Sequence, residues 1–240
     1  MSANFIVASS SSLVFDATDD VMTENGALTI SVWIKPITVG VGNLGRVINR
    51  GVFATSGVEI IMTATETVQF FVNGSTNLFR VASNNSITLN TWQHILVTWN
   101  GGTAFTGVNI YVNGVETSYS AGQNATTPID NSTTLLRIGN VSTGTRSFDG
   151  LVSEVGIWNS VLSLNEIKQL SSSRTRYVPL QVSPSSLKRY FPLDEFSNKD
   201  TVSGIGVIRD RSPLLITGSG SFVTGGALPT MLSESVVSYL

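Results

Sequence analysis

The only histidine of the chain, His94, stands between two tryptophans in the stretch TWQHILVTWNGG (91–102). A catalytic histidine needs a nucleophile within hydrogen-bond reach and a carboxylate that orients its ring. The nearest acidic residue in sequence, Glu116, belongs to the next expected strand, and no G-x-S-x-G motif occurs. We therefore expect His94 to be a packed residue of the scaffold. With one histidine and no cysteine, a zinc or iron site of ordinary type is not expected.

Paired carboxylates are the alternative catalytic chemistry, because glycosidases use two carboxyl groups about 5–9.5 Å apart. Glu59 and Glu66 fall on separate expected strands, and Glu116 follows an expected hairpin. No spacing in the sequence gathers them on one face. We therefore expect a protein that is not an enzyme.

A cation site is the third possibility. Asp16, Asp19 and Asp20 cluster in one expected loop, and carboxylate oxygens are the ligands that calcium prefers. The same acids can instead cap turns. Both readings stay open from these residues alone.

Tryptophans and arginines could bind a sugar or another ligand. All four tryptophans fall on expected strands, which favours core packing over a sugar-stacking platform; they are Trp33, Trp92, Trp99 and Trp158. The sequence assigns no single ligand-binding residue, and loops are the better candidates because binding residues lie disproportionately on loops. The loops in question are 40–57, 73–79, 101–107 and 141–147, with Arg46, Arg80 and Arg146 as the cationic candidates.

The elements that must position these residues are strands. Alternation of apolar and polar residues dominates as far as about residue 158, and Asn-Gly turn signals occur at 25–26, 73–74, 100–101 and 113–114. The expected strands are 28–36, 46–53, 58–64, 67–74, 78–83, 92–100, 108–114, 134–140 and 151–159. Short strands at this spacing, without intervening helices, predict an all-β, two-sheet antiparallel sandwich.

One short helix is expected at 163–170. Ser163 and Glu166 have the spacing of a capping box. Leu164, Ile167 and Leu170 form its expected apolar face. A helix this short must dock on the sandwich to be stable.

Composition narrows the classes of partner. Only 12% of the 240 residues are charged, against the usual ~25%, and the net charge is −2. These values show no excess of basic residues of the kind that nucleic-acid-binding proteins use. We see no signal peptide and no apolar run of the ~20 residues that a membrane span needs.

Five segments together resemble the laminin-G-like, concanavalin A-like jelly-roll family, which is related to the pentraxins. In order they are SLVFDATDDVM (12–22), LTISVWIKP (28–36), TWQHILVTWNGG (91–102), VNIYVNGVE (108–116), and LRIGN with RSFDGLVSEVGIWNSVLSLNEIKQL (136–170). The resemblance implies a jelly-roll fold over about two-thirds of the chain. It also implies that the strand around His94 belongs to the scaffold.

The resemblance bears on two of the candidate sites. Relatives often hold a cation between the loop at 16–20 and an acidic pair, which reads Ser153-Glu154 here. The implied ligands of a structural calcium ion are thus Asp19, Asp20 and Glu154. The glucanases of this fold carry an E-x-D-x-x-E string, which this sequence lacks.

The C-terminal stretch 187–226 resembles the segment that usually precedes the first strand of the family. We expect it to close the sandwich in cis, as in a circular permutation, or to be donated to a neighbouring subunit; a truncated second repeat is the alternative. The expected organisation is a jelly roll at 1–171, a connector at 172–186 and a closing segment at 187–240.

The function that we expect is a non-catalytic recognition or assembly module. The missing signal peptide, the missing disulfides and the displaced segment favour a virion structural, decoration or attachment protein on a virion or extracellular surface. Its partners would be other protein subunits, in a homo-oligomer or virion shell, or a cell-surface glycan. The alternatives are a soluble or secreted carbohydrate-binding module and, less favoured, a glycoside hydrolase.

Overall fold

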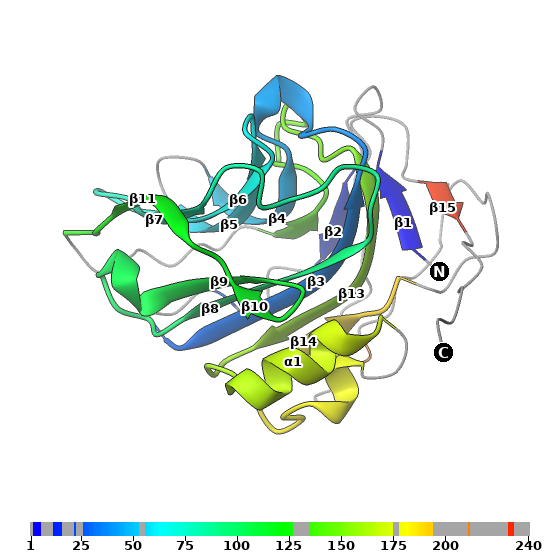
Figure 1. The fold of residues 1–240 in the computed structure, drawn as a ribbon. Helices are drawn as coiled ribbons and strands as arrows, with labels where there is room; N and C mark the ends of the chain where they lie inside the picture. The colour runs from blue at the N-terminus through cyan, green and yellow to red at the C-terminus, as the bar shows by residue number, and fades with distance from the viewer. Residues whose placement is uncertain are drawn as a thin grey trace.

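The computed structural model describes residues 2–5, 12–15, 22, 26–52, 56–126, 135–174, 178–193, 211 and 230–232. These residues form two antiparallel sheets that face each other, with one helix against the outside of the larger sheet (Figure 1). The predicted all-β, concanavalin A-like sandwich is confirmed.

The larger sheet, sheet A, has the strand order β10-β9-β8-β3-β13-β1-β15, and β14 also pairs with β13. Its strands are β1 (Ser2–Phe5), β3 (Leu28–Pro36), β8 (Gln93–Trp99), β9 (Val108–Val112), β10 (Val115–Glu116), β13 (Gly150–Trp158), β14 (Leu187–Phe191) and β15 (Thr230–Leu232). Most of the strands predicted for this sheet have bounds within one or two residues of those expected.

The smaller sheet, sheet B, has the strand order β11-β7-β6-β5-β4-β12-β2. Its strands are β2 (Leu13–Phe15), β4 (Arg46–Val52), β5 (Ser56–Thr63), β6 (Thr67–Asn73), β7 (Leu78–Ala82), β11 (Tyr119–Gln123) and β12 (Leu136–Ile138). The sequence analysis missed β11, which pairs with β7 through an irregular register.

The core lies between the two sheets and follows the predicted alternation. On β8, Ile95, Val97 and Trp99 belong to the cluster between the sheets, whereas Leu96 belongs to a second cluster on the outside of sheet A. Each sheet therefore has an outward face whose side chains do not belong to the core between the sheets.

Helix α1 (Leu164–Ser172) covers part of the outward face of sheet A. The capping box forms as predicted: the Ser163 side chain accepts from the Glu166 backbone N–H, and the Glu166 side chain accepts from the Ser163 N–H. Ile167 and Leu170 are buried against Trp158 and its neighbours. The prediction for Leu164 is wrong: this residue is 58% exposed, and of the three expected apolar positions the cluster contains Ile167 and Leu170.

Of the predicted Asn-Gly turns, Asn113-Gly114 makes the two-residue connection between β9 and β10. Both residues have positive φ, 50° and 76°, which is the requirement of the type I′ turn. The Asn113 side chain also accepts a hydrogen bond from the His94 backbone N–H at 2.8 Å, so this turn is tied to β8.

The start of the C-terminal stretch pairs with the same chain. β14 lies antiparallel to the second half of β13, and β1 pairs with the first half of β13 along the same edge. Within the expected connector, Val182 packs in the cluster under α1, and its carbonyl accepts from the Trp158 indole N–H at 2.9 Å. Most of 194–226 lies outside the described residues, and the proposed division of the chain stays a prediction.

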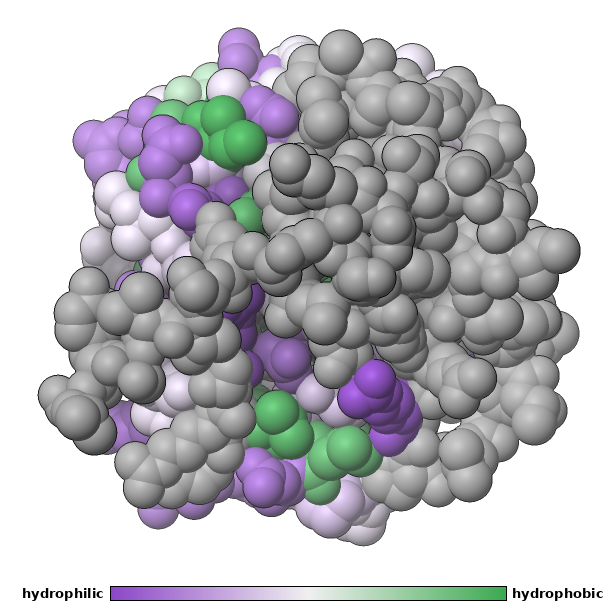
Figure 2. Space-filling model, turned by 90° about the vertical axis from the view of Figure 1, so that its right-hand side faces the viewer, coloured by the Kyte–Doolittle hydropathy of each residue, from purple (hydrophilic) through white to green (hydrophobic). Residues whose placement is uncertain are grey.

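Short 3-10 helices occupy three of the connections, at η2 (Val41–Asn43), η3 (Phe105–Gly107) and η4 (Pro179–Gln181). No helix among the described residues is long and apolar enough to cross a membrane. On the side drawn in Figure 2, the described residues expose small hydrophobic areas set between hydrophilic ones.

Candidate functional site

His94 lies on the outward face of sheet A and has no exposed surface. Its Nε2 is 2.7 Å from the Ser31 hydroxyl, its ring centre lies 5.3 Å from that of Trp33, and Nδ1 has no hydrogen-bond partner within the described part of the chain. Burial lowers the pKa of His94 to about 3, so the imidazole is neutral near pH 7. The prediction of a packed histidine is confirmed. The Ser31–His94 pair is sealed from solvent and lacks an orienting carboxylate among the described residues.

The four tryptophans divide into two pairs. Trp99 and Trp158 are buried, as predicted. The prediction of core packing is wrong for Trp33, on the outward face of sheet A, and for Trp92, just before β8: both are partly exposed and lie outside the two buried clusters. The Arg174 guanidinium lies 4.1 Å from the centre of the Trp92 ring, within the range of a cation–π contact.

The proposed calcium ligands are only partly described. Asp19 and Asp20 lie outside the described residues. Glu154 is half-buried, has a φ of 53° at a register shift in β13, and its Oε2 accepts a hydrogen bond from the Tyr190 hydroxyl at 2.6 Å. Among the described residues no three acidic, histidine or cysteine side chains form a cluster fit for a metal. The calcium site stays a prediction, and the one ligand that the structure describes ties β13 to β14.

The three glutamates considered for catalysis lie in different environments. Glu59 is in the middle of β5, Glu66 is in the turn after β5 with a φ of 52°, and Glu116 is exposed on β10 of the other sheet. The Glu116 carboxylate accepts a hydrogen bond from the Tyr119 hydroxyl at 2.7 Å. Burial raises the pKa of Tyr119 to about 12, so this hydroxyl stays protonated and donates.

The three candidate arginines lie in two different environments. Arg80 spans the space between the sheets: it donates to the Val108 carbonyl and to the Asn109 side chain, and its guanidinium lies 3.3 Å from the centre of the Tyr119 ring. These contacts make Arg80 part of the scaffold. Arg46 and Arg146 lie together, because the Arg46 N–H donates to the Arg146 carbonyl at 2.9 Å.

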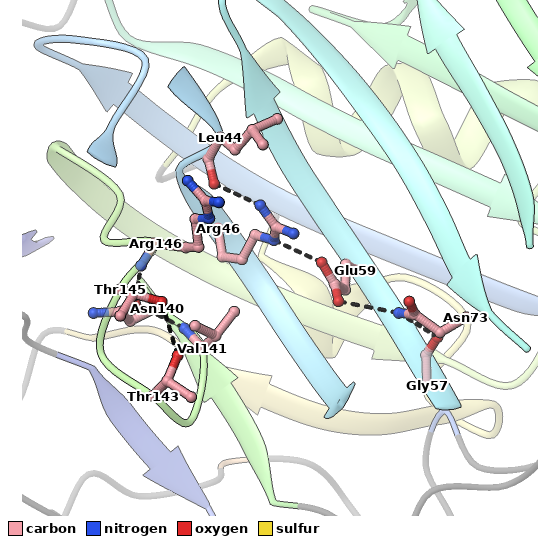
Figure 3. A network of polar contacts seen from close by, with 10 residues as sticks. All are labelled: Leu44, Arg46, Gly57, Glu59, Asn73, Asn140, Val141, Thr143, Thr145 and Arg146. Atoms are coloured by element: carbon pink, nitrogen blue, oxygen red, sulfur yellow. Dashed lines mark hydrogen bonds and ion pairs between the residues drawn. The ribbon is translucent and has the colours of Figure 1, made fainter. Parts of the chain in front are cut away.

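The outward face of sheet B holds a buried network centred on Glu59. Arg46 Nε donates to Glu59 Oε2 at 2.6 Å, and Asn73 Nδ2 donates to Glu59 Oε1 at 3.0 Å. Arg46 also donates to the Leu44 carbonyl at 2.7 Å. Figure 3 shows these side chains crossing β4, β5 and β6 in a line. Such polar planar groups, fixed on strands, can form hydrogen bonds to hydroxyl or carboxylate groups of a ligand.

Asn49 lies beside this network, but its side chain forms no hydrogen bond with it. It is opposite Glu59 on one side and Arg137 on the other, in the strand order β12-β4-β5. The side chain has no exposed surface, and neither Nδ2 nor Oδ1 has a hydrogen-bond partner among the residues that the structure describes. A buried amide without partners costs about 1–3 kcal/mol, so it calls for an explanation.

A pair of phenylalanines extends the same face towards β7. Phe71 and Phe79 are opposite each other on β6 and β7, and Phe71 is in turn opposite Glu59. Their rings are stacked with centres 5.9 Å apart and planes 1° apart, and Phe79 is partly exposed. The face therefore combines a flat apolar area with adjacent polar groups, which is the combination that a ligand site commonly uses.

The loop that follows β12 borders this face at the Arg46 end. Asn140 is buried and organises the loop: its Oδ1 accepts from the N–H groups of Val141 and Arg146, and its Nδ2 donates to Ser147 Oγ at 2.6 Å. Thr143 and Thr145 are exposed on the loop. Of the four loops predicted as binding loops, 141–147 is thus a border of the candidate site that is held by hydrogen bonds to Asn140 and, through Arg146, to Arg46.

The sequence analysis missed Asn49, Arg137 and the two phenylalanines. Their signal was the alternation itself, because polar or aromatic residues occupy outward positions of the expected strands 46–53, 67–74, 78–83 and 134–140. The sequence analysis predicts ligand contacts in loops, whereas the candidate residues lie on strands.

The comparisons with known proteins concern the fold. A family model described as the concanavalin A-like lectin/glucanases superfamily, Laminin_G_3, matches residues 9–168. No curated protein sequence matches the chain.

Three solved structures illustrate the similarity. A Bacteroides ovatus protein proposed to bind carbohydrate has a TM-score of 0.60 and 21% identity over 97% of this chain; this chain spans 60% of that protein. The CBM40 domain of a Ruminococcus gnavus IT-sialidase, bound to α2,3-sialyllactose, has a TM-score of 0.50 and 13% identity over 71% of this chain and 98% of its own. A heptameric pentraxin from Limulus polyphemus has a TM-score of 0.43 and 19% identity over 68% and 82%.

Proposed function

The chain belongs to the concanavalin A-like lectin/glucanase superfamily, and we propose that it is a non-catalytic carbohydrate-recognition module. Its binding surface is the outward face of sheet B, between the loop at 140–147 and the Phe71–Phe79 pair. The structures that support a binding role are the carbohydrate-binding Bacteroides ovatus candidate and the sialyllactose-bound domain, both of which share the fold.

The observation that carries the proposal is the unpartnered amide of Asn49. It lies in the same row of the sheet as Glu59 and Phe71. A sugar presents hydroxyl groups, which can both donate to and accept from an amide, and an apolar ring face, which packs on aromatic rings. Because Asn49 is enclosed, binding includes a local opening around it, which slows association.

The non-catalytic part of the proposal rests on how the acids are used. Both oxygens of Glu59 accept hydrogen bonds, one of them within an ion pair to Arg46. A carboxylate whose two oxygens are both engaged, on a side chain with no exposed surface, is poorly placed to reach the scissile bond of a saccharide. Glu59 therefore serves the site by positioning Arg46 and Asn73.

The test is carbohydrate binding by the native chain and two matched variants. We expect a glycan array to give selective binding, and Asn49→Leu to lower the affinity for the best ligand by about tenfold or more, the effect of an unpaired buried polar group. Asn159→Leu, a change at an exposed asparagine after β13, is the control and should leave the affinity unchanged.

Two results would contradict the proposal at different levels. Equal affinities for the native chain and Asn49→Leu would move the site away from sheet B. No binding to any glycan, with a folded protein, would overturn carbohydrate recognition itself. Hydrolysis of a saccharide that is lost in Glu59→Gln would overturn the non-catalytic assignment.

We also keep, as a proposal from the sequence, the role of a virion decoration or attachment protein that assembles with further protein subunits on a virion or other extracellular surface. Its cheapest test is the mass of the native chain in solution by light scattering. An oligomer supports assembly, and a monomer at high concentration contradicts it.

A further inference from the structure

The charges on the outward face of sheet B do not balance. Arg46 is paired with Glu59, whereas Arg137, on the neighbouring strand β12, has no carboxylate partner among the described residues. Among the described residues, its guanidinium donates one hydrogen bond, to the Leu135 carbonyl at 3.3 Å. Arg137 is partly buried, and this burial lowers its pKa. A guanidinium that loses water without gaining an anion is destabilising, unless a ligand supplies the anion.

The loop at the border of the site adds a second positive charge. The Arg146 guanidinium lies against Gly42, in the position that a side chain at residue 42 would need. It too has no carboxylate partner within the described part of the chain. The whole protein has a net charge of −2. The two arginines without carboxylate partners therefore give the candidate site a local positive charge that is opposite in sign to the net charge of the chain.

The geometry pairs the unbalanced charge with the unpartnered amide. Arg137 and Asn49 are directly opposite each other on β12 and β4, so their outward side chains are neighbours. A guanidinium and an amide N–H₂ in this arrangement can both donate to one carboxylate. Asn49 Oδ1 and the remaining lone pairs of Glu59 can accept from hydroxyl groups of the same ligand.

We propose that the ligand of this face is an acidic sugar, a uronic acid or a sialic acid, whose carboxylate binds between Arg137 and Asn49. This inference rests on the proposed function and specifies the ligand class of the same site. The Phe71–Phe79 pair contacts the apolar face of the acidic sugar or of the next sugar unit. Arg146, on the 140–147 loop, adds electrostatic attraction for anionic saccharide chains. Neutral sugars leave Arg137 without an anion and bind weakly.

The test compares acidic and neutral probes by isothermal titration calorimetry. The acidic probes are 3′-sialyllactose and trigalacturonic acid, and the neutral probes are lactose and maltotriose. We expect one acidic probe to bind and its neutral counterpart to bind at least about tenfold more weakly. Raising NaCl from about 0.05 to about 0.5 M should weaken the acidic probe alone, because salt screens the charge contact.

The variants locate the carboxylate contact. Arg137→Gln should lower the affinity for the acidic probe by about tenfold or more, and Arg137→Lys should lower it less, since lysine keeps the charge and loses the two-pronged geometry. Lys168→Gln, which removes a positive charge from the exposed side of α1, is the control for net charge and should have no effect. Circular dichroism melts establish that each variant is folded.

The outcomes separate this inference from the proposed function. Equal binding of acidic and neutral probes would overturn the acidic ligand and leave carbohydrate recognition in place. Acidic binding that survives in Arg137→Gln would overturn the assigned contact. Binding of sialyllactose but not trigalacturonic acid, or the reverse, supports the inference and identifies the source of the carboxylate. Failure of all four probes and of the glycan array would overturn both proposals.

Discussion

The outward faces of the two sheets use buried polar groups in opposite ways. On sheet A, α1 places Ile167 and Leu170 over an apolar cluster, and the buried His94 is neutral and bonded to one serine. On sheet B, the corresponding face buries the Arg46–Glu59 ion pair beside the Asn49 amide, which has no hydrogen-bond partner among the described residues. Sheet A is thus closed by apolar packing, whereas sheet B retains hydrogen-bonding capacity.

This difference separates stability from binding within one sandwich. Apolar burial stabilises without specifying a ligand, at about 25 cal/mol for each Å² removed from water. A buried ion pair gives little net stability, although breaking it is costly, and an unpartnered amide is destabilising. Groups that do not improve the stability of a fold are good candidates for function, which is why we assign recognition to sheet B.

The largest effect should come from breaking the ion pair on sheet B. Glu59→Ala leaves Arg46, which is 3% exposed, without its anion. We expect the free energy of unfolding to fall by about 3–5 kcal/mol, measured by urea denaturation. The double variant Arg46→Met/Glu59→Leu should recover most of this loss, because two apolar residues replace both charges. A Glu59→Ala variant as stable as the native chain would show that the pair is not buried in solution.

The next effect belongs to the apolar cover of sheet A. Ile167→Ala should lower the free energy of unfolding by about 2–4 kcal/mol through loss of buried surface and a cavity under α1. Leu164→Ala, three residues earlier on the exposed side of the helix, should change it by less than about 0.5 kcal/mol. Glycan affinity should be unchanged in both folded variants. A loss of affinity in Ile167→Ala would break the division of roles between the two faces.

The smallest effect is the pH dependence due to His94. Its pKa is about 3 in the folded chain and about 6.5 when unfolded, so the unfolded chain takes up a proton first as the pH falls. Stability is therefore full above about pH 7 and declines towards pH 3. Between pH 7 and pH 5, where this single histidine dominates, we expect a loss of roughly 2 kcal/mol by chemical denaturation. A flat profile over that window would mean that His94 is accessible to protons in the folded state.

Much of the fold was predictable because local patterns are sufficient for it. The alternation in LTISVWIKP predicted β3 with its bounds, Leu28–Pro36, and the Ser163–Glu166 spacing predicted the capping box. Asn113-Gly114 predicted its turn because few other residue pairs tolerate two successive positive φ angles. Leu164 was misassigned because spacing fixes which residues share a helix face, but not how far the contact with the sheet extends.

The candidate site was less predictable, because it depends on which strands become neighbours. Asn49 and Arg137 are 88 positions apart in sequence and are opposite each other only because β12 pairs with β4. The sequence alone does not distinguish Arg46, Arg80 and Arg146 as candidates for ligand binding. Strand pairing joins Arg46 to Glu59 and the 140–147 loop, and it directs Arg80 to Tyr119 instead.

The sequence by itself determined the class of fold, the packed state of His94 and the family, since all three depend on alternation, turns and local motifs. The tertiary structure alone decided which polar side chains lie buried together and which of them lack partners. The physical reason is that hydrogen bonds and ion pairs require approach within about 3–4 Å. Such distances between remote strands follow from register and sheet order, which no local pattern contains.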